Sequence, residues 1–353
     1  MLAATSDEVG FVHPSQFAAM SDMSSTSTGA SQVIHTDMAF WSEDHKLGIS
    51  TEVIQPLYVA AKRAFMSSRD QYKVLVGENI ASDSSSLNTI EYEVMKHSRA
   101  VLLLSGDFGT AWNSRRWVIK MIADKPTNMQ EVLKSESELA ERIAEKSKMN
   151  YRAWNHRCWL VSYMPETQVI DELVNHRDWA GLHIADNSCF HYRTRLISRT
   201  LDDSWYKQDL KASPRNSAEV CQLWKEELTW SEILIKRYIG REALWLYRRV
   251  LSMCWIKHFA SRTGETHMDS FLDNELHLFR SCTTIPDNVF EDYQSQAMFA
   301  ATYIMWLIKQ MDKPQSMETR EKVGEEVEEV LNKVCPEKAF LWDLARIKSE
   351  WLV

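Results

Sequence analysis

The chain has 353 residues, 44% hydrophobic and 25% charged, which is enough for one large or two ordinary globular domains. Its 41 lysines and arginines face 49 aspartates and glutamates, and a formal net charge of −8 argues against a protein that mainly neutralises nucleic-acid phosphates. Only ten glycines and eight prolines interrupt it, which favours long helices. The 14 tryptophans indicate a motif that reuses this bulky side chain.

Residues 1–45 include the small, polar stretch SDMSSTSTGASQ, and we predict a disordered or loosely packed segment there. The segment lacks the pattern of a secretory signal, and the first arginine is Arg63, which disfavours a transit peptide. The six cysteines form no C-x-x-C pair, so we expect reduced, mostly buried thiols. The longest apolar-leaning run, residues 297–308, is too short to cross a membrane, and we expect a cytoplasmic protein without a transmembrane segment.

A tryptophan–arginine motif recurs between residues 46 and 261. Its anchor aromatics are 42, 36 and 55 residues apart, and an arginine follows each anchor three positions later. Periods of this size predict an all-α fold, a right-handed α-α superhelix of stacked helical hairpins. The motif residues are Trp112, Arg115, Trp154, Arg157, Phe190, Arg193, Trp245 and Arg248.

Each repeat is expected to contain a first helix, a short turn and a second helix that begins near the anchor aromatic. Gly240 stands where a left-handed residue could end one first helix. Beyond residue 261 the motif disappears but helical patterns continue, so we predict divergent capping helices over residues 262–353.

Packing explains the repeated motif better than catalysis does, because a catalytic residue is needed once and a packing residue in every unit. His156, His183 and His191 lie near the repeat turns, but they lack metal-site spacing, so we predict no metal ligation by this chain. The acidic pair Asp202 and Asp203 lacks the third acid of a magnesium–diphosphate motif, and we interpret it as an exposed helix end.

The segments NYRAWNHRCWLV, DNSCFHYRTRLI and EALWLYRRVL together resemble the protein prenyltransferase α-subunit repeat. The resemblance covers about Glu91 to Cys254 and is strongest to the third, α-subunit-repeat-containing type of the family. The pairs Glu138-Leu139, Glu172-Leu173 and Glu227-Leu228 match the first helix of that repeat.

The resemblance implies a crescent of hairpins around a separate β subunit, which carries the zinc and the geranylgeranyl diphosphate; no cofactor is expected in this chain. It implies that the pair acts as a protein geranylgeranyltransferase, with a Rab geranylgeranyltransferase-like β subunit as partner and C-terminal cysteines of other proteins as substrate. The enzyme would exist only as that complex. The alternative is a non-catalytic helical-repeat adaptor for trafficking proteins.

In farnesyltransferase-like α subunits a lysine directly before the Asn-Tyr pair reaches the diphosphate. Here Met149 precedes Asn150, and Lys148 lies one position too early, so a direct catalytic role is in doubt. The residues expected to face the β subunit or substrate are Lys148, Asn150, Tyr151, His191, Tyr192 and Arg193.

We interpret the first copy of the motif, GTAWNSRRWVIKMI, as the start of one unit joined to the end of another. Relatives of this type are expected to carry one more hairpin near Asn113–Arg116. The sequence therefore predicts an array that is one hairpin short at that point, with its activity left open.

Overall fold

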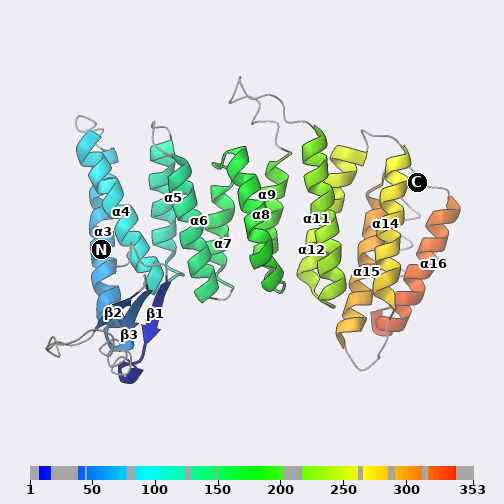
Figure 1. Ribbon diagram of the computed structural model, residues 1–353, viewed down its shortest axis with the longest axis horizontal. Coiled ribbons are helices and arrows are strands. Elements are labelled where there is room, and N and C mark those ends of the chain that lie inside the picture. Colours follow the sequence, from blue (N-terminus) through cyan, green and yellow to red (C-terminus); the bar gives the residue numbers. More distant parts are fainter. Residues whose placement is uncertain are drawn as a thin grey trace. The chain divides into compact units, whose positions relative to one another are not determined.

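The computed structural model describes residues 8–16, 39–43, 46–77, 84–123, 129–147, 149–201, 217–260, 265–284, 291–311 and 317–338. The chain forms two compact units, Met1–Leu160 and Val161–Val353. Figure 1 shows the helices and strands of both. Lys148 and the pair Asp202 and Asp203 lie outside the described residues. None of the helices within these ranges is both long and apolar enough to cross a membrane.

The first unit consists mainly of helical hairpins. Helix α3 packs on α4, α4 on α5, α6 on α7, and the second helices α5 and α7 also contact each other. A 3-10 turn, η1 (Thr51–Val53), precedes α3. The bounds are α3 Ile54–Gly77, α4 Ser84–Leu104, α5 Gly109–Ala123, α6 Met129–Lys146 and α7 Tyr151–Leu160.

A small sheet precedes these helices, which differs from the expectation for residues 1–45. Strand β3 (Lys46–Ser50) is central, parallel to β1 (Glu8–Val12) and antiparallel to β2 (Phe40–Glu43). Val9, Leu47 and Ile49 form a buried cluster against Ile54 and neighbouring apolar side chains. Short segments such as EVGFV are stabilised as strands by the apolar side chains that they pack against in the fold. Composition alone therefore did not predict these strands.

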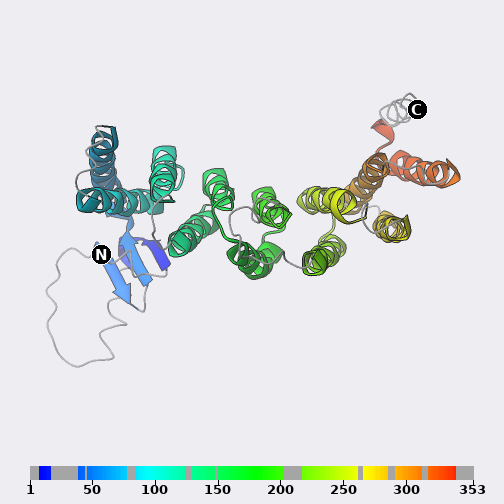
Figure 2. The same ribbon diagram turned by 90° about the horizontal axis from the view of Figure 1, so that it is seen from above.

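The second unit repeats the hairpin arrangement. Helix α8 packs on α9, α11 on α12, α14 on α15 and α15 on α16, while the second helices α9, α12 and α15 contact each other in turn. Figure 2 shows these helices nearly end-on. The bounds are α8 Glu166–Leu182, α9 Asn187–Arg199, α11 Ser217–Arg237, α12 Glu242–Trp255, π-helical η2 Ile256–Ala260, α14 Glu265–Thr283, α15 Glu291–Lys309, α16 Met317–Val334 and 3-10 η3 Pro336–Lys338.

The all-α helical-repeat fold predicted from the sequence is therefore confirmed within each unit. Helix α5 is continuous through Asn113–Arg116 and forms a hairpin with α4, and an array one hairpin shorter than in relatives stays a prediction. Hairpin stacking also continues past residue 261 into α14 and α15.

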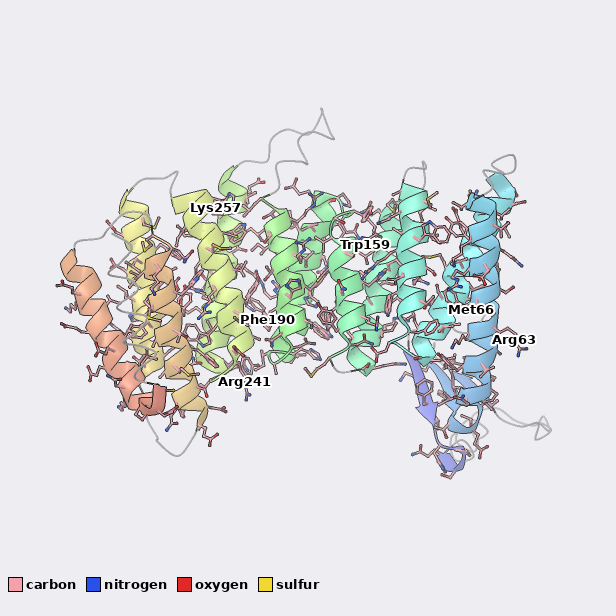
Figure 3. The ribbon with its side chains drawn as sticks, turned by 180° about the vertical axis from the view of Figure 1, so that it is seen from behind. Arg63, Met66, Trp159, Phe190, Arg241 and Lys257 are labelled. Atoms are coloured by element: carbon pink, nitrogen blue, oxygen red, sulfur yellow. The ribbon has the colours of Figure 1, made fainter. Side chains whose placement is uncertain are left out.

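The anchor aromatics fill the space between helices. Phe190, labelled on α9 in Figure 3, lies 5.4 Å from Tyr247 and 6.3 Å from Trp230, measured between ring centroids. The indole of Trp112 also donates a 2.8 Å hydrogen bond to the Gly106 carbonyl. The four anchors are each 2% exposed: Trp112, Trp154, Phe190 and Trp245.

Gly240 ends the turn between α11 and α12 in the left-handed conformation that the sequence suggested, with a φ of 72°. Its N–H donates to the Gln296 side-chain oxygen at 2.9 Å, and Trp245 Nε1 donates to the same oxygen at 3.2 Å. A Cβ on Gly240 would lie 2.9 Å from the Asp292 carbonyl oxygen, so this turn requires glycine for both conformation and space.

We predict that Gly240→Ala lowers the free energy of unfolding by at least ~1–2 kcal/mol, because the left-handed conformation is strained and backbone must move. Gly324→Ala is the control: that glycine is exposed within α16 with open space around its Cα, and the substitution should raise stability by ~0.5–1 kcal/mol. Urea unfolding measures both. Equal effects of the two substitutions would contradict the role assigned to Gly240.

Candidate functional site

The turn between α6 and α7 contains the residues that the sequence singled out in the first unit. Asn150 is buried, and its Oδ1 accepts hydrogen bonds from the backbone N–H groups of Arg152 and Ala153, both at 3.1 Å. This is the geometry of a helix N-cap, which satisfies donors at the start of α7. Asn150 therefore positions the turn and does not face a partner.

Met149 and Tyr151, on either side of the cap, are the exposed residues of this turn. Met149 has a φ of 62° and is 82% exposed, and Tyr151 is 71% exposed. A non-glycine residue in the left-handed region is uncommon and strained. The turn thus holds two large apolar side chains in solvent, and Tyr151 alone of the described candidates here stays available for contact with a partner.

The turn is held against the preceding one, between α4 and α5. A Cβ on Gly106 would lie 2.6 Å from Ile143 Cγ2 and 2.7 Å from Asn150 Nδ2, so only glycine fits there. A Cβ on Gly109 would similarly lie 2.5 Å from the Arg152 guanidinium. Gly106, which no motif marked, thus allows the two turns to approach closely, whereas the exposed Arg152 side chain could move aside for a Cβ on Gly109.

The second candidate group begins α9, whose N-terminus is capped by Asp186. His191 is exposed, whereas Tyr192 and Arg193 are 0% exposed. Tyr192 donates to Glu172 at 2.7 Å, and Arg193 is paired with Glu227. The prediction that Tyr192 and Arg193 face a β subunit or substrate is wrong, because both are enclosed by their own unit.

Arg193 forms a buried junction between two hairpins. Its Nη1 donates to the Leu173 carbonyl of α8 at 3.0 Å, and its Nε and Nη2 donate to Glu227 Oε1 of α11 at 3.0 and 2.5 Å. Tyr247 donates to the same carboxylate from α12 at 2.5 Å. One carboxylate therefore joins the second helix of one hairpin to both helices of the next.

The same junction recurs at the next hairpin. Arg248 donates to both oxygens of Glu275 in α14, to the Leu228 carbonyl and, at 2.7 Å, to Ser231 Oγ. Tyr303 in α15 donates to Glu275 at 2.7 Å, as Tyr247 does to Glu227. Helices α14 and α15 therefore supply the glutamate and the tyrosine of a junction, although the sequence beyond residue 261 lacks the tryptophan–arginine motif.

A third copy lies in the first unit. Arg115 donates to both oxygens of Glu136 in α6 and, from Nη1, to the Met95 carbonyl at 2.5 Å and Ser98 Oγ at 2.7 Å. His156 takes the place of the tyrosine, with its Nε2 3.1 Å from Glu136 Oε2. The first copy of the motif thus makes a complete junction.

These contacts correct the register of one predicted pair. Glu136 and His156 are 20 residues apart, as are Glu172 and Tyr192, and Glu227 and Tyr247. Glu136 therefore corresponds to Glu172 and Glu227, whereas Glu138 is exposed. Contact to the tyrosine or histidine 20 residues later, rather than a following leucine, identifies the corresponding acid of these three first helices.

Burial and charge together set the protonation of this junction. Burial alone would raise the pKa of Glu136, but Arg115 and the hydrogen bond from His156 lower it to about 2. Burial lowers the pKa of His156, and its Nδ1 accepts a 3.3 Å hydrogen bond from Arg116 Nε. These partners assign a neutral His156 that carries its proton on Nε2.

Arg157 departs from the pattern within the first unit. Its Nε donates to Ser137 Oγ at 3.0 Å, and its Nη2 lies 3.4 Å from Glu141 Oε2. The arginine is 2% exposed, so it too belongs to the core.

Chemically, the buried junctions are suited to holding helices in register. Arginine donors and a tyrosine or histidine donor already bind their carboxylates, so these carboxylates are not placed to bind a substrate. Within the described ranges no group of three histidine, cysteine, aspartate or glutamate side chains has a geometry that could hold a metal ion. All six cysteines lie within the described ranges, where four of them are buried and none forms a disulfide.

We predict that Glu136→Gln lowers the free energy of unfolding by ~3–5 kcal/mol at neutral pH, because Arg115 would keep a buried, uncompensated charge. Glu138→Gln, two residues away on the same helix, should change it by less than ~0.5 kcal/mol. The Glu136 contribution is present above its unfolded pKa near 4.5 and is lost as pH falls toward 2. Urea titrations of both variants between pH 7 and 2.5 measure this; equal losses would contradict the assigned register.

We also predict that Asn150→Ala costs ~0.5–2 kcal/mol, because two N–H groups at the start of α7 lose their acceptor. Asn150→Asp should retain most of the stability, since it keeps the accepting oxygen. Asn155→Ala, at an exposed position of the same helix, is the control and should stay within ~0.5 kcal/mol of the wild type. Thermal unfolding of the three variants measures these losses of stability. A loss for Asn155→Ala as large as that for Asn150→Ala would contradict the capping role.

Comparison with known proteins identifies the repeat. Residues 133–164 match the family model of the protein prenyltransferase alpha subunit repeat. The chain is 26% identical over 261 residues to the human protein prenyltransferase alpha subunit repeat-containing protein 1, covering 56% of this chain and 64% of that protein. It is 26% identical over 228 residues to protein 1-B of this name from Xenopus laevis, covering 50% and 53%.

A more distant similarity, 25% identity over 164 residues, connects the chain to the geranylgeranyl transferase type-2 subunit alpha of Bos taurus, covering 46% of this chain and 25% of that protein. The matches thus span between about half and two thirds of the repeat-containing relatives. The matched residues 133–164 include Asn150, Trp154 and Arg157, whose packing is described above. From repeat, fold and relatives together, the chain carries the protein prenyltransferase alpha subunit repeat and is similar to proteins built from it.

Proposed function

We propose that the chain is the α-type subunit of a protein geranylgeranyltransferase that pairs with a Rab geranylgeranyltransferase-like β subunit and prenylates C-terminal cysteines of other proteins. The observation that carries the proposal is the similarity to geranylgeranyl transferase type-2 subunit alpha, and the repeating junction between hairpins supports it. A rigid array of this kind suits a subunit that supports a partner's active site.

In this proposal the chain supports catalysis and does not perform it. The zinc and geranylgeranyl diphosphate belong to the β subunit, where zinc would favour the substrate thiolate and donors would stabilise the leaving diphosphate. The arginines and glutamates of the junctions are buried and already paired. Met149 stands where related α subunits carry a lysine, so Tyr151 is the residue of this turn that we assign to the partner contact.

A non-catalytic adaptor is the second candidate. It is favoured by the enclosure of Tyr192 and Arg193, which removes two of the polar groups expected at a catalytic interface. Helical-repeat arrays commonly bind proteins through extended faces without chemistry of their own. Stable binding of trafficking proteins by a chain that never assembles with a prenyltransferase β subunit would favour the adaptor.

Co-expression with a Rab geranylgeranyltransferase β subunit tests the proposal. We predict co-purification of a one-to-one complex that transfers labelled geranylgeranyl to a protein with C-terminal cysteines. Tyr151→Ala should weaken the complex, whereas Tyr92→Ala, which removes a 64% exposed tyrosine from α4, should not. Failure to form any complex, with the chain shown to be folded by circular dichroism, would refute the proposal.

A further inference from the structure

The two helical layers of the repeats differ in charge. The second helices α5, α7 and α9 contain no aspartate or glutamate, whereas α6, which precedes α7, contains several glutamates and α8, which precedes α9, contains both acids. This segregation occurs in a chain with a net charge of −8. The basic residues of these second helices are Arg115, Arg116, Lys120, Arg152, Arg157, Arg193, Arg195 and Arg199.

Arg116 is a basic residue outside the buried junctions that contacts two aromatic rings. Its guanidinium carbon lies 5.7 Å from the ring centroid of Trp159, labelled in Figure 3, and its Nε donates to His156. The side chain is half-buried, and it has no carboxylate partner among the described residues. The indole and the imidazole therefore hold the guanidinium in place and leave its terminal N–H groups available.

The same arrangement recurs in the second unit. Arg249 follows the junction arginine Arg248 as Arg116 follows Arg115, and its guanidinium carbon lies 5.8 Å from the ring centroid of Trp306. Trp306 follows Tyr303 by three positions, as Trp159 follows His156. Each unit thus presents an arginine fixed on an indole from the next second helix.

We propose that the second-helix face of the first unit, made of Arg116, Lys120 and Arg152 with Trp159, docks an acidic segment of a partner protein. Arg116 and Lys120 are one helical turn apart on α5, and Lys120 and Arg152 are exposed. A planar guanidinium with free N–H edges matches a carboxylate in two-point contact. This inference does not depend on the prenyltransferase proposal.

A protein is favoured over a membrane surface or a nucleic acid by what surrounds these charges. Met121, the residue after Lys120, is 38% exposed, and the partly exposed indole of Trp159 lies against Arg116. Tryptophan, methionine and arginine are the residues enriched at protein interfaces. The net charge of −8 opposes adsorption to extended polyanions, whereas a short acidic segment can avoid the rest of the surface.

The test uses the full chain and a fluorescein-labelled peptide of ten glutamates, followed by fluorescence anisotropy at low salt. We expect saturable binding that weakens with salt, and a loss of at least about fivefold in affinity for the triple variant Arg116→Gln, Lys120→Gln, Arg152→Gln. Arg116→Lys, which keeps the charge and loses the planar fork, should lie between. The control removes the same charge elsewhere, through Lys73→Gln, Lys96→Gln and Lys236→Gln, and should change affinity by less than about twofold.

Three results would overturn the inference. One is the absence of saturable peptide binding by the wild type, and another is equal loss in the triple variant and its control. The third is tighter binding, through the same three residues, to phosphatidylserine vesicles or to single-stranded DNA than to the peptide. Circular dichroism melting of each variant separates lost binding from lost folding.

Discussion

The structure of each unit depends on one buried interaction, an arginine from a second helix that binds a glutamate in the first helix of the next hairpin. The arginine also binds a carbonyl 20 residues earlier in its own hairpin, and a tyrosine or histidine saturates the glutamate. A buried ion pair adds little stability over apolar packing, but breaking it is costly, so its main effect is to fix which helices meet and in which register. The four anchor aromatics pack between the helices that the ion pairs hold in register.

Sequence reasoning predicted the fold class because the aromatic–arginine spacing is local and repeated. It did not predict the acid partner of Arg115, since Glu136 and Glu138 lie on the same helix and only three-dimensional contact distinguishes them. It also ended the repeats too early, because α15 keeps Tyr303 but has no arginine three residues after its anchor position. The prediction of the candidate site fails in part for a related reason. Polar residues in a dense motif suggest an exposed surface, but the hairpins enclose Tyr192 and Arg193.

With the junction arginines and glutamates confined to the core, the surfaces available for function are a turn and a helical face. The turn exposes Met149 and Tyr151 beside a capping asparagine, and the face presents arginines fixed on indoles. The face of the first unit depends on a junction: Arg116 follows Arg115 directly, and its partner His156 binds Glu136. The residues that hold the helices in register therefore also orient the groups that a partner could meet.

A double-mutant cycle between Arg248 and Glu275 tests this account most directly, because no sequence pattern marked Glu275 as the partner of Arg248. Arg248→Met, Glu275→Gln and the double variant would be compared by urea unfolding. The account predicts that the two losses are strongly non-additive, with a coupling free energy of ~2–3 kcal/mol, as for residues in one buried network. Losses that add to within ~0.5 kcal/mol would contradict it, since the two side chains would then stabilise the array independently.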